Sequence, residues 1–272
     1  MKNKITAIIL TYNNSAMIEA CLNSLTWCDE VLLIDHNSTD QTTQKAEALG
    51  AKVINFSHPS FARRRNEAIK YAKGSWLFYI DADERVTPTL AKEIMVHAET
   101  ASAAALSFRR KNYLYGKLFI SGGWQNDWVT RVFQKTTFKQ WRGAIHESPI
   151  FEGEAIRLSS PLLHFTHRST EENLRKSANW TKMEAELLFK AGVPPVKFLT
   201  LVRKGSMEFF RRALIGKGYR DGLAGLIEAL VQGMNRVLVY IQVWELQQKP
   251  SLPEIYQQED EKLKSWWQNE KK

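Results

Sequence analysis

Asp81 and Asp83 are the side chains whose type and spacing best suit a metal ion. They directly follow Trp76–Ile80, a short apolar stretch typical of a buried strand. Two carboxylates on the turn after a strand can aim at the same point. Mg²⁺ or Mn²⁺ needs few protein carboxylates where substrate phosphates supply further oxygens. The pair therefore predicts a divalent metal that offsets the charge of a leaving diphosphate, with an acidic surface turn as the alternative.

Three other kinds of phosphate-handling protein require patterns that differ from this one. A phosphatase of the haloacid dehalogenase type carries its Asp-x-Asp after the first strand, with Thr or Val where this chain has Arg85. A dinucleotide-binding dehydrogenase needs Gly-x-Gly-x-x-Gly after the first strand, and residues 11–14 contain no glycine. The sequence has no Walker A loop either.

Two further polar segments follow apolar stretches in the same way. Thr11, Tyr12 and Asn13 follow Ile5–Leu10, and Asp35 follows Val31–Ile34. Parallel sheets bind ligands beyond the carboxyl ends of their strands. We therefore expect these segments and the two aspartates to converge on one crevice.

The first hundred residues alternate strand and helix patterns, which predicts a parallel α/β sheet with helices on both faces. Thr87 and Pro88 are typical of an N-cap and first helical residue, and Gly50 and Gly74 end helices. The expected strands are 5–10, 31–34, 52–56 and 76–80, and the expected helices are 15–25, one that stops at 50, 61–73 and 87–100.

The rest of the chain changes character twice. Strands are expected at 103–109, 129–133 and 162–165, and the chain becomes helical beyond residue 170. One long amphipathic helix is predicted by a seam of apolar residues with alternating steps of four and three: Leu223, Ile227, Leu230, Met234, Val237, Ile241 and Trp244. We expect no membrane-spanning helix, and a loosely ordered charged tail after Pro250.

These patterns also resemble a known family. The resemblance lies in residues 8–13, 33–40 and 80–84 together with Arg65-Asn66, and it points to glycosyltransferase family 2 and its GT-A nucleotide-diphospho-sugar transferase fold. Downstream, Trp124, residues 131–133, His146-Glu147 and His164 look like a subgroup that includes lipopolysaccharide core β-glucosyltransferases. The implied domains are a catalytic domain at 1–168 and a helical, basic region at 169–272. The catalytic domain has a nucleotide-binding half at about 1–100 and an acceptor half at about 101–168.

The resemblance implies a role for each polar position of the first half. Thr11 and Tyr12 would line the nucleobase pocket, and Asp35 would bind the base or ribose. Asp83 would be the principal metal ligand. The family often has a second acidic residue where this chain has His36. The implied nucleotide-sugar site consists of Thr11, Tyr12, Asn13, Asp35, Arg65 and Asp81.

Three residues of the second half complete the implied site. An inverting transfer needs a base for the acceptor hydroxyl, and Glu147 is our candidate. His146 would be a metal ligand or an orienting donor, and both residues could instead be ordinary loop residues. His164 would join Asp83 and Asp81 at the metal or contact the diphosphate, and the alternative is a hydrogen-bonded core histidine.

The charge distribution bears on partners and location. The formal net charge is +9, which suits anionic partners. Basic and apolar residues interleave between 197 and 220, as in a helix lying on anionic lipid, and packing on the catalytic domain is the alternative. We expect no nucleic-acid partner because no such motif occurs. Only two cysteines occur, which favours a reducing cytosol.

The resulting hypothesis is an inverting, metal-dependent transferase at the inner face of the cytoplasmic membrane. It would move glucose from UDP-glucose to a lipid-linked acceptor, an inner-core heptose of lipopolysaccharide. Trp124, Trp128 and Trp141 could stack on sugars or belong to the core. The alternatives are another donor or acceptor, such as a polyprenyl-linked glycan or a peptide, and a non-catalytic membrane-associated scaffold with a transferase fold.

Overall fold

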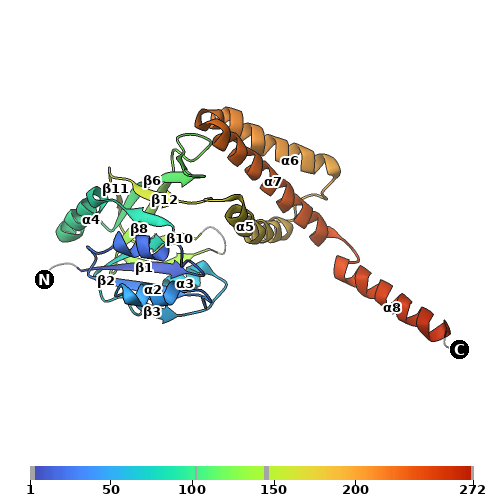
Figure 1. Ribbon diagram of the computed structural model, residues 1–272, viewed down its shortest axis with the longest axis horizontal. Coiled ribbons are helices and arrows are strands. Elements are labelled where there is room, and N and C mark those ends of the chain that lie inside the picture. Colours follow the sequence, from blue (N-terminus) through green and yellow to red (C-terminus); the bar gives the residue numbers. More distant parts are fainter. Residues whose placement is uncertain (1–3, 102, 144–146, 271–272) are drawn as a thin grey trace. The chain divides into compact units, whose positions relative to one another are not determined.

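The computed structural model describes residues 4–101, 103–143 and 147–270. The chain forms two compact units, Met1–Arg168 and Ser169–Lys272, which we call unit 1 and unit 2. In Figure 1, unit 1 runs from blue to yellow and unit 2 continues to red. Each unit is described separately below.

Unit 1 is built on a mixed sheet with the strand order β3-β2-β1-β4-β8-β6-β12-β5. Strands β1 to β4 run parallel, and β8 joins β4 antiparallel. The strands of this path are β1 (Ile5–Thr11), β2 (Glu30–Asp35), β3 (Lys52–Asn55), β4 (Trp76–Asp81), β5 (Glu84–Val86), β6 (Ala105–Leu114), β8 (Trp128–Gln134) and β12 (Leu162–Phe165). The short strands β7 (Lys117–Leu118) and β11 (Ala155–Arg157) pair with β6. The predicted strands are therefore confirmed, with boundaries moved by a few residues.

Alternate residues of β1 pack into two separate cores, because successive side chains of a strand point to opposite faces. Ile5 and Ile9 pack with α1 (Ile18–Asn23), α2 (Thr42–Ala48) and α4 (Pro88–Thr100). Ile8 and Leu10 pack on the other side with α3 (Phe61–Ala68) and with β9 (Phe138–Arg142), which pairs with β10 (Ser148–Phe151). The sheet is thus covered on both faces, as predicted.

The helix ends in unit 1 follow local side-chain chemistry. Thr87 caps α4 by accepting a hydrogen bond from the Leu90 N–H at 3.2 Å, and Pro88 is the first helical residue, as predicted. Helices α1 and α3 are shorter than expected. Their last turns tighten, with N–H groups bonding three residues back, as Leu25 does to the Leu22 carbonyl at 2.9 Å.

Unit 2 is helical. It contains α5 (Thr170–Lys190), α6 (Phe198–Phe210), α7 (Gly222–Gln247) and α8 (Leu252–Glu270), with the short turns η1 (Arg211–Ile215) and η2 (Gly218–Asp221) between α6 and α7. Helices α6 and α7 form a hairpin that crosses closely at Gly205, where a Cβ atom would lie 2.5 Å from Val237 Cγ2. Helix α5 joins α7 through the ion pair of Glu184 with Arg236, at 2.6 Å.

Two features of unit 2 differ from expectation. The predicted long helix exists as α7, but much of its apolar seam is exposed, with Leu223 at 74% and Leu230 at 54%. By length and composition alone the stretch Gly218–Gln247 could cross a membrane, although a core helix of a soluble protein passes the same test. The tail after Pro250 is not loosely ordered: it forms α8, a helix with no buried residue.

Candidate active site

The carboxyl ends of three parallel strands bring the predicted nucleotide-sugar residues to one edge of unit 1. Thr11 at the end of β1 pairs in register with Asp35 at the end of β2, and Leu10 pairs with Asp81 at the end of β4. The predicted convergence of these three polar segments is therefore confirmed. Arg65 comes to the same place from α3 through its ion pair with Asp81.

Asp35 organises the loops at this edge. Its side chain is 1% exposed and accepts hydrogen bonds from Thr11 Oγ1 at 3.0 Å and from the Ser38 N–H at 2.7 Å. The loop after β1 is tied to the loop after β2 because Asn13 donates its N–H to Ser38 Oγ at 2.9 Å. Asn13 has a left-handed backbone with φ of 52°. In this structure Asp35 and Asn13 hold the two loops together.

Tyr12 and His36 form the surface of the same loops. Tyr12 is 54% exposed, and its ring centroid lies 5.5 Å from that of His36. His36 Nδ1 also lies 2.9 Å from Ser57 Oγ. Burial, with a smaller contribution from Arg64, lowers the pKa of His36 below its ordinary value, so a neutral imidazole faces this surface at neutral pH. The pair could stack on a planar ligand.

Two arginines hold Asp81. Arg65 Nη2 lies 3.2 Å from Asp81 Oδ1, and Arg131 Nη2 lies 2.8 Å from Asp81 Oδ2. Burial opposes ionisation of Asp81, but Arg131 and then Arg65 outweigh it and hold the pKa of this carboxyl below its ordinary value. In the described contacts Asp81 pairs with the two arginines, whereas Asp83 lies near His164.

Arg131 was not predicted as a site residue. It is 9% exposed and lies within β8, between Thr130 and Val132. A charged residue inside an apolar strand is unusual unless it is paired, and this was the available indication in the sequence. Its partner Asp81 lies on β4, the neighbouring strand.

Trp141 belongs to the core. It is 4% exposed and packs edge-on against Tyr79 and Phe133, with ring centroids 5.1 and 5.7 Å away. The Arg65 guanidinium lies 4.6 Å from its ring centroid. Trp141 is therefore a core residue and does not stack on a sugar. Trp128 remains 40% exposed, with the Arg157 guanidinium 4.9 Å from its ring.

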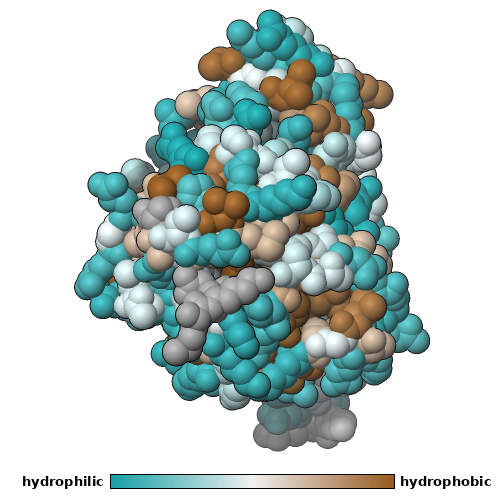
Figure 2. Space-filling view, turned by 90° about the vertical axis from the view of Figure 1, so that its left-hand side faces the viewer, coloured by the Kyte–Doolittle hydropathy of each residue, from teal (hydrophilic) through white to brown (hydrophobic). Residues whose placement is uncertain are grey.

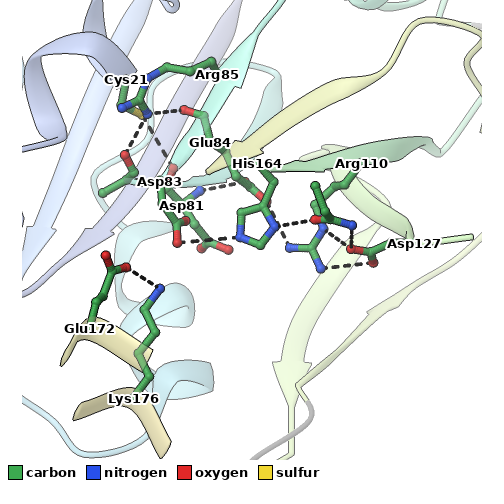
Figure 3. A network of polar contacts seen from close by, with 12 residues as sticks. Cys21, Asp81, Asp83, Glu84, Arg85, Arg110, Asp127, His164, Glu172 and Lys176 are labelled. Carbon is green, nitrogen blue, oxygen red and sulfur yellow. Dashed lines mark hydrogen bonds and ion pairs between the residues drawn. The ribbon is translucent and has the colours of Figure 1, made fainter. Parts of the chain in front are cut away.

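Glu84 anchors the turn that carries the two aspartates. It is fully buried; its Oε2 accepts the Asp81 N–H at 2.9 Å, and its Oε1 lies 3.2 Å from Arg110 Nη1. Burial, together with the nearby Asp81 carboxylate, raises the pKa of Glu84. Figure 3 shows Arg110 continuing this network to Asp127, which it grips through Nε at 2.8 Å and Nη2 at 3.0 Å. Both Glu84 oxygens are thus occupied by structural contacts.

Asp83 and His164 face each other, with His164 Nε2 3.6 Å from Asp83 Oδ2 (Figure 3). The other ring nitrogen, Nδ1, lies 2.6 Å from Asn112 Oδ1. A carboxylate oxygen and an imidazole nitrogen at this separation are a suitable pair of donors for Mn²⁺ or Mg²⁺. Within the described residues, no group of three or more His, Cys, Asp or Glu side chains is placed to hold a metal.

Glu147 lies beside the arginine cluster. Its Oε2 is 3.4 Å from Arg65 Nη1, and its side chain is 11% exposed. Its second oxygen, Oε1, is buried and has no hydrogen-bond partner among the described atoms. His146 lies outside the described residues. Glu147 therefore has one carboxylate oxygen on Arg65 and one that makes no hydrogen bond to the described atoms.

Comparison with known proteins gives three findings. A family model described as Glycosyl transferase family 2 matches residues 6–151. An uncharacterized glycosyltransferase of Rickettsia bellii is 27% identical over 90% of this chain and 88% of its own length. The lipopolysaccharide core biosynthesis glycosyltransferase LpsC of Rhizobium meliloti is 24% identical over 93% of this chain and 97% of its own length.

Among solved structures, the mannosyltransferase PcManGT of Pyrobaculum calidifontis, in complex with GDP-Man and Mn²⁺, is similar with a TM-score of 0.50. The two chains are 14% identical, and the likeness covers 91% of this chain and 89% of the other. At this identity the likeness bears on the fold, and it confirms the predicted GT-A fold.

Proposed function

Because this chain belongs to glycosyl transferase family 2, we propose that it transfers glucose from UDP-glucose to an inner-core heptose of lipopolysaccharide, with inversion at the anomeric carbon. The observation that carries the proposal is that two groups of polar side chains lie near the same edge of the sheet. Asp83 with His164 forms one, and Asp81 with Arg65 and Arg131 forms the other. The name of the Rhizobium meliloti relative supports the acceptor class, and glucose follows from the resemblance of the downstream motifs.

We propose that Asp83 and His164 hold Mg²⁺ or Mn²⁺, and that Asp81 stays with its arginines. The bound metal would offset negative charge on the leaving diphosphate. The similar mannosyltransferase PcManGT forms a complex with GDP-Man and Mn²⁺, which supports a divalent metal here. Arg65 and Arg131 keep Asp81 ionised and add positive charge at the same edge.

In the proposed transfer step, Glu147 acts as the general base. The acceptor hydroxyl oxygen attacks the anomeric carbon, and the bond from that carbon to the diphosphate oxygen breaks, with its electron pair leaving on UDP. The hydroxyl proton passes to Glu147, whose Oε1 is unpartnered among the described atoms while Oε2 stays with Arg65. Tyr12 and Thr11 would receive the nucleobase, and Asp35 would bind the base or ribose.

We also propose that unit 2 attaches the enzyme to anionic lipid at the inner face of the cytoplasmic membrane, where a lipid-linked acceptor lies. Between Lys197 and Asp221 the chain has seven basic and two acidic residues. Many apolar residues of the hairpin are exposed, and we call the following set the hairpin face: Phe198, Leu199, Val202, Phe210, Leu214, Ile215, Leu223, Ile227, Leu230, Met234 and Leu238. Figure 2 shows hydrophobic surface among hydrophilic side chains at the top of the view. An apolar surface edged by Lys and Arg suits an anionic interface.

The test offers the purified full chain a panel of UDP-sugars with Mn²⁺ and a heptose-containing core acceptor. We expect glucosyl transfer with inversion. Use of another donor alone, or transfer only to a polyprenyl-phosphate or peptide acceptor, would refute the assigned substrates and leave family-level transferase activity standing. Neither transfer nor donor hydrolysis with any sugar would favour the non-catalytic scaffold.

A further inference from the structure

Asn112 occupies the centre of a buried polar chain beside the candidate metal ligands. It lies on β6 and is fully buried. Its Nδ2 donates to the Trp124 carbonyl at 3.2 Å and to Asp127 Oδ2 at 3.0 Å. Both partners accept and cannot donate, so they fix which end of the amide carries the nitrogen. Its oxygen must therefore face His164.

The orientation of this amide determines where the His164 proton sits. Asn112 Oδ1 lies 2.6 Å from His164 Nδ1, and a carbonyl oxygen only accepts. Nδ1 must therefore carry a proton, whether the ring is neutral or charged. In the neutral ring Nε2 then has a lone pair, and that atom is the one 3.6 Å from Asp83 Oδ2.

We infer that Asn112 is a positioning residue that fixes His164 in the Nδ1–H tautomer, so that its Nε2 lone pair points at a cation held with Asp83. The role of this tautomer in metal binding rests on the proposed function. The assignment of the tautomer itself rests only on the hydrogen bonds of Asn112. A hydrogen bond on the second ring nitrogen both orients a ligating histidine and raises its basicity. One connected network of polar contacts thus reaches both aspartates of the turn, Asp83 through His164 and Asp81 through Glu84.

Asp127 makes this arrangement rigid. The Arg110 guanidinium holds both Asp127 oxygens, and the same guanidinium contacts Glu84. Glu84 in turn accepts the Asp81 N–H. A displaced Asn112 amide would leave polar groups around it without hydrogen-bond partners, which is unfavourable in a buried site. The amide therefore has one favourable orientation.

The direct test reads the tautomer of His164 by ¹⁵N NMR of histidine-labelled, metal-free protein, at a pH where the ring is neutral. His164→Gln assigns the resonance. We expect wild type to show the Nδ1–H tautomer and Asn112→Leu to lose it. An Nε2–H tautomer in wild type, or no change in Asn112→Leu, would overturn the inference; the wild-type spectrum decides it even if a variant fails to fold.

Ser107→Ala is the matched control. Ser107 lies on the same strand and is 8% exposed, and its hydroxyl bonds to Thr130 Oγ1 at 2.8 Å. We expect this loss of a buried hydrogen bond to leave the His164 spectrum unchanged. A changed tautomer in Ser107→Ala would point to general loosening of β6 and count against a specific role of Asn112.

Mn²⁺ titration in the presence of UDP, followed by electron paramagnetic resonance, gives a second reading. We expect Asn112→Leu to weaken Mn²⁺ binding roughly 10- to 100-fold. A shifted tautomer with unchanged Mn²⁺ affinity would sink the positioning role while the tautomer assignment stood. Absence of Mn²⁺ binding by wild type would instead count against the proposed metal dependence.

Discussion

At the scale of single residues, Glu147 has one oxygen on Arg65 and another that is buried and unpartnered among the described atoms. Glu147→Gln keeps the shape of the side chain but removes its ability to take a proton. We expect kcat to fall by about 10²- to 10⁴-fold with little change in donor binding. Steady-state kinetics with UDP-glucose, combined with UDP titration, separates the two effects.

Glu152→Gln serves as the control because Glu152 is 75% exposed and pairs only with surface Lys139 at 3.2 Å in the described contacts. It should leave kcat unchanged. A decrease smaller than about fivefold in Glu147→Gln would require a different base. Glu84 is a poor substitute, since both of its oxygens are bound within a fully buried site.

The proposed metal dependence can be tested at Asp83, the proposed principal metal ligand. Asp83→Ala leaves His164 without its carboxylate partner and should abolish both transfer and metal-dependent UDP binding. Calorimetry of UDP binding with and without Mn²⁺ measures the second effect, and Asp260→Ala on the exposed helix α8 is the control. Wild-type activity in Asp83→Ala, or full activity of the native enzyme in excess EDTA, would eliminate the metal from the mechanism.

Arg131 stabilises the ionised form of Asp81, and this predicts a pH dependence. The folded pKa of Asp81 is depressed, so the stabilisation is present above the ordinary carboxyl pKa and is lost as pH falls through the folded value. Arg131→Met should therefore lower the free energy of unfolding by about 1–3 kcal/mol near neutral pH. The difference from wild type should shrink below about pH 4.

Urea unfolding followed across pH measures this effect. Arg63→Met is the matched control, because Arg63 is an exposed neighbour on α3 and its loss should change stability by less than about 0.5 kcal/mol. A stability difference that is independent of pH would mean that Arg131 contributes packing and not charge.

At the scale of elements, local patterns predicted what local forces decide. Short apolar stretches predicted the strands. The polar residue after each stretch predicted that Thr11, Asp35 and Asp81 lie together at the carboxyl ends of the strands. The Thr87-Pro88 start of α4 followed from capping chemistry alone. These features depend on neighbours in sequence, so one sequence is enough to predict them.

Pairings between distant elements were not predictable in the same way. Arg131 meets Asp81 across 50 positions, and Arg110 meets Glu84 across 26. Nothing near Asn112 in sequence indicates that it lies against His164, because that contact depends on the parallel pairing of β12 with β6. The pairing of Asp81 with Arg65 and Arg131 likewise joins residues 16 and 50 positions apart.

Helix α8 was missed although its pattern was present. Ser251 and Glu254 form a reciprocal cap: the Ser251 N–H donates to Glu254 Oε2 at 2.7 Å, and the Glu254 N–H donates to Ser251 Oγ at 3.4 Å. Its apolar residues Ile255, Leu263 and Trp266 also recur at helical spacing. The high charge of the segment and the preceding Pro250 led to the wrong prediction.

The crossing of α6 and α7 gives a prediction for unit 2. Gly205→Ala would place a Cβ atom 2.5 Å from Val237 Cγ2, so either the Val237 side chain must change its rotamer or the helices must move apart. Alanine favours a helix over glycine by about 1 kcal/mol, but overpacking costs about 1–3 kcal/mol. We expect net destabilisation in urea unfolding and its relief in the double variant Gly205→Ala, Val237→Ala. A stabilised single variant would contradict the close crossing, and Ser206→Ala on the exposed side is the control.

At the scale of the whole molecule, charge and apolar surface are unevenly distributed. The net charge is +9, yet α8 has five acidic and two basic residues, so the positive charge lies elsewhere. Seven basic residues accompany the hairpin face between Lys197 and Asp221, whereas the apolar residues of α8 stand among carboxylates. An anionic membrane should therefore select the hairpin face over α8.

The corresponding prediction concerns vesicle binding by the full chain. Ile215 and Leu223, at 78% and 74% exposure, should insert into the interface, each contributing about 1.5–3 kcal/mol. The double variant Ile215→Glu, Leu223→Glu should lower binding to vesicles of phosphatidylglycerol and phosphatidylcholine roughly 100-fold or more in sedimentation assays. Transfer to a soluble acceptor fragment should persist, because neither residue belongs to unit 1.

Two comparisons make that prediction specific. Tyr256→Glu, Trp266→Glu alters equally exposed residues of α8 and should leave binding unchanged. Salt should weaken binding, since the Debye length shortens from about 30 Å at 0.01 M to about 3 Å at 1 M. Wild-type protein that stays free of anionic vesicles at low salt would refute the lipid interface. Light scattering could instead show that the wild-type protein is a dimer and that the double variant Ile215→Glu, Leu223→Glu is a monomer. That result would mean that a second copy covers the hairpin face.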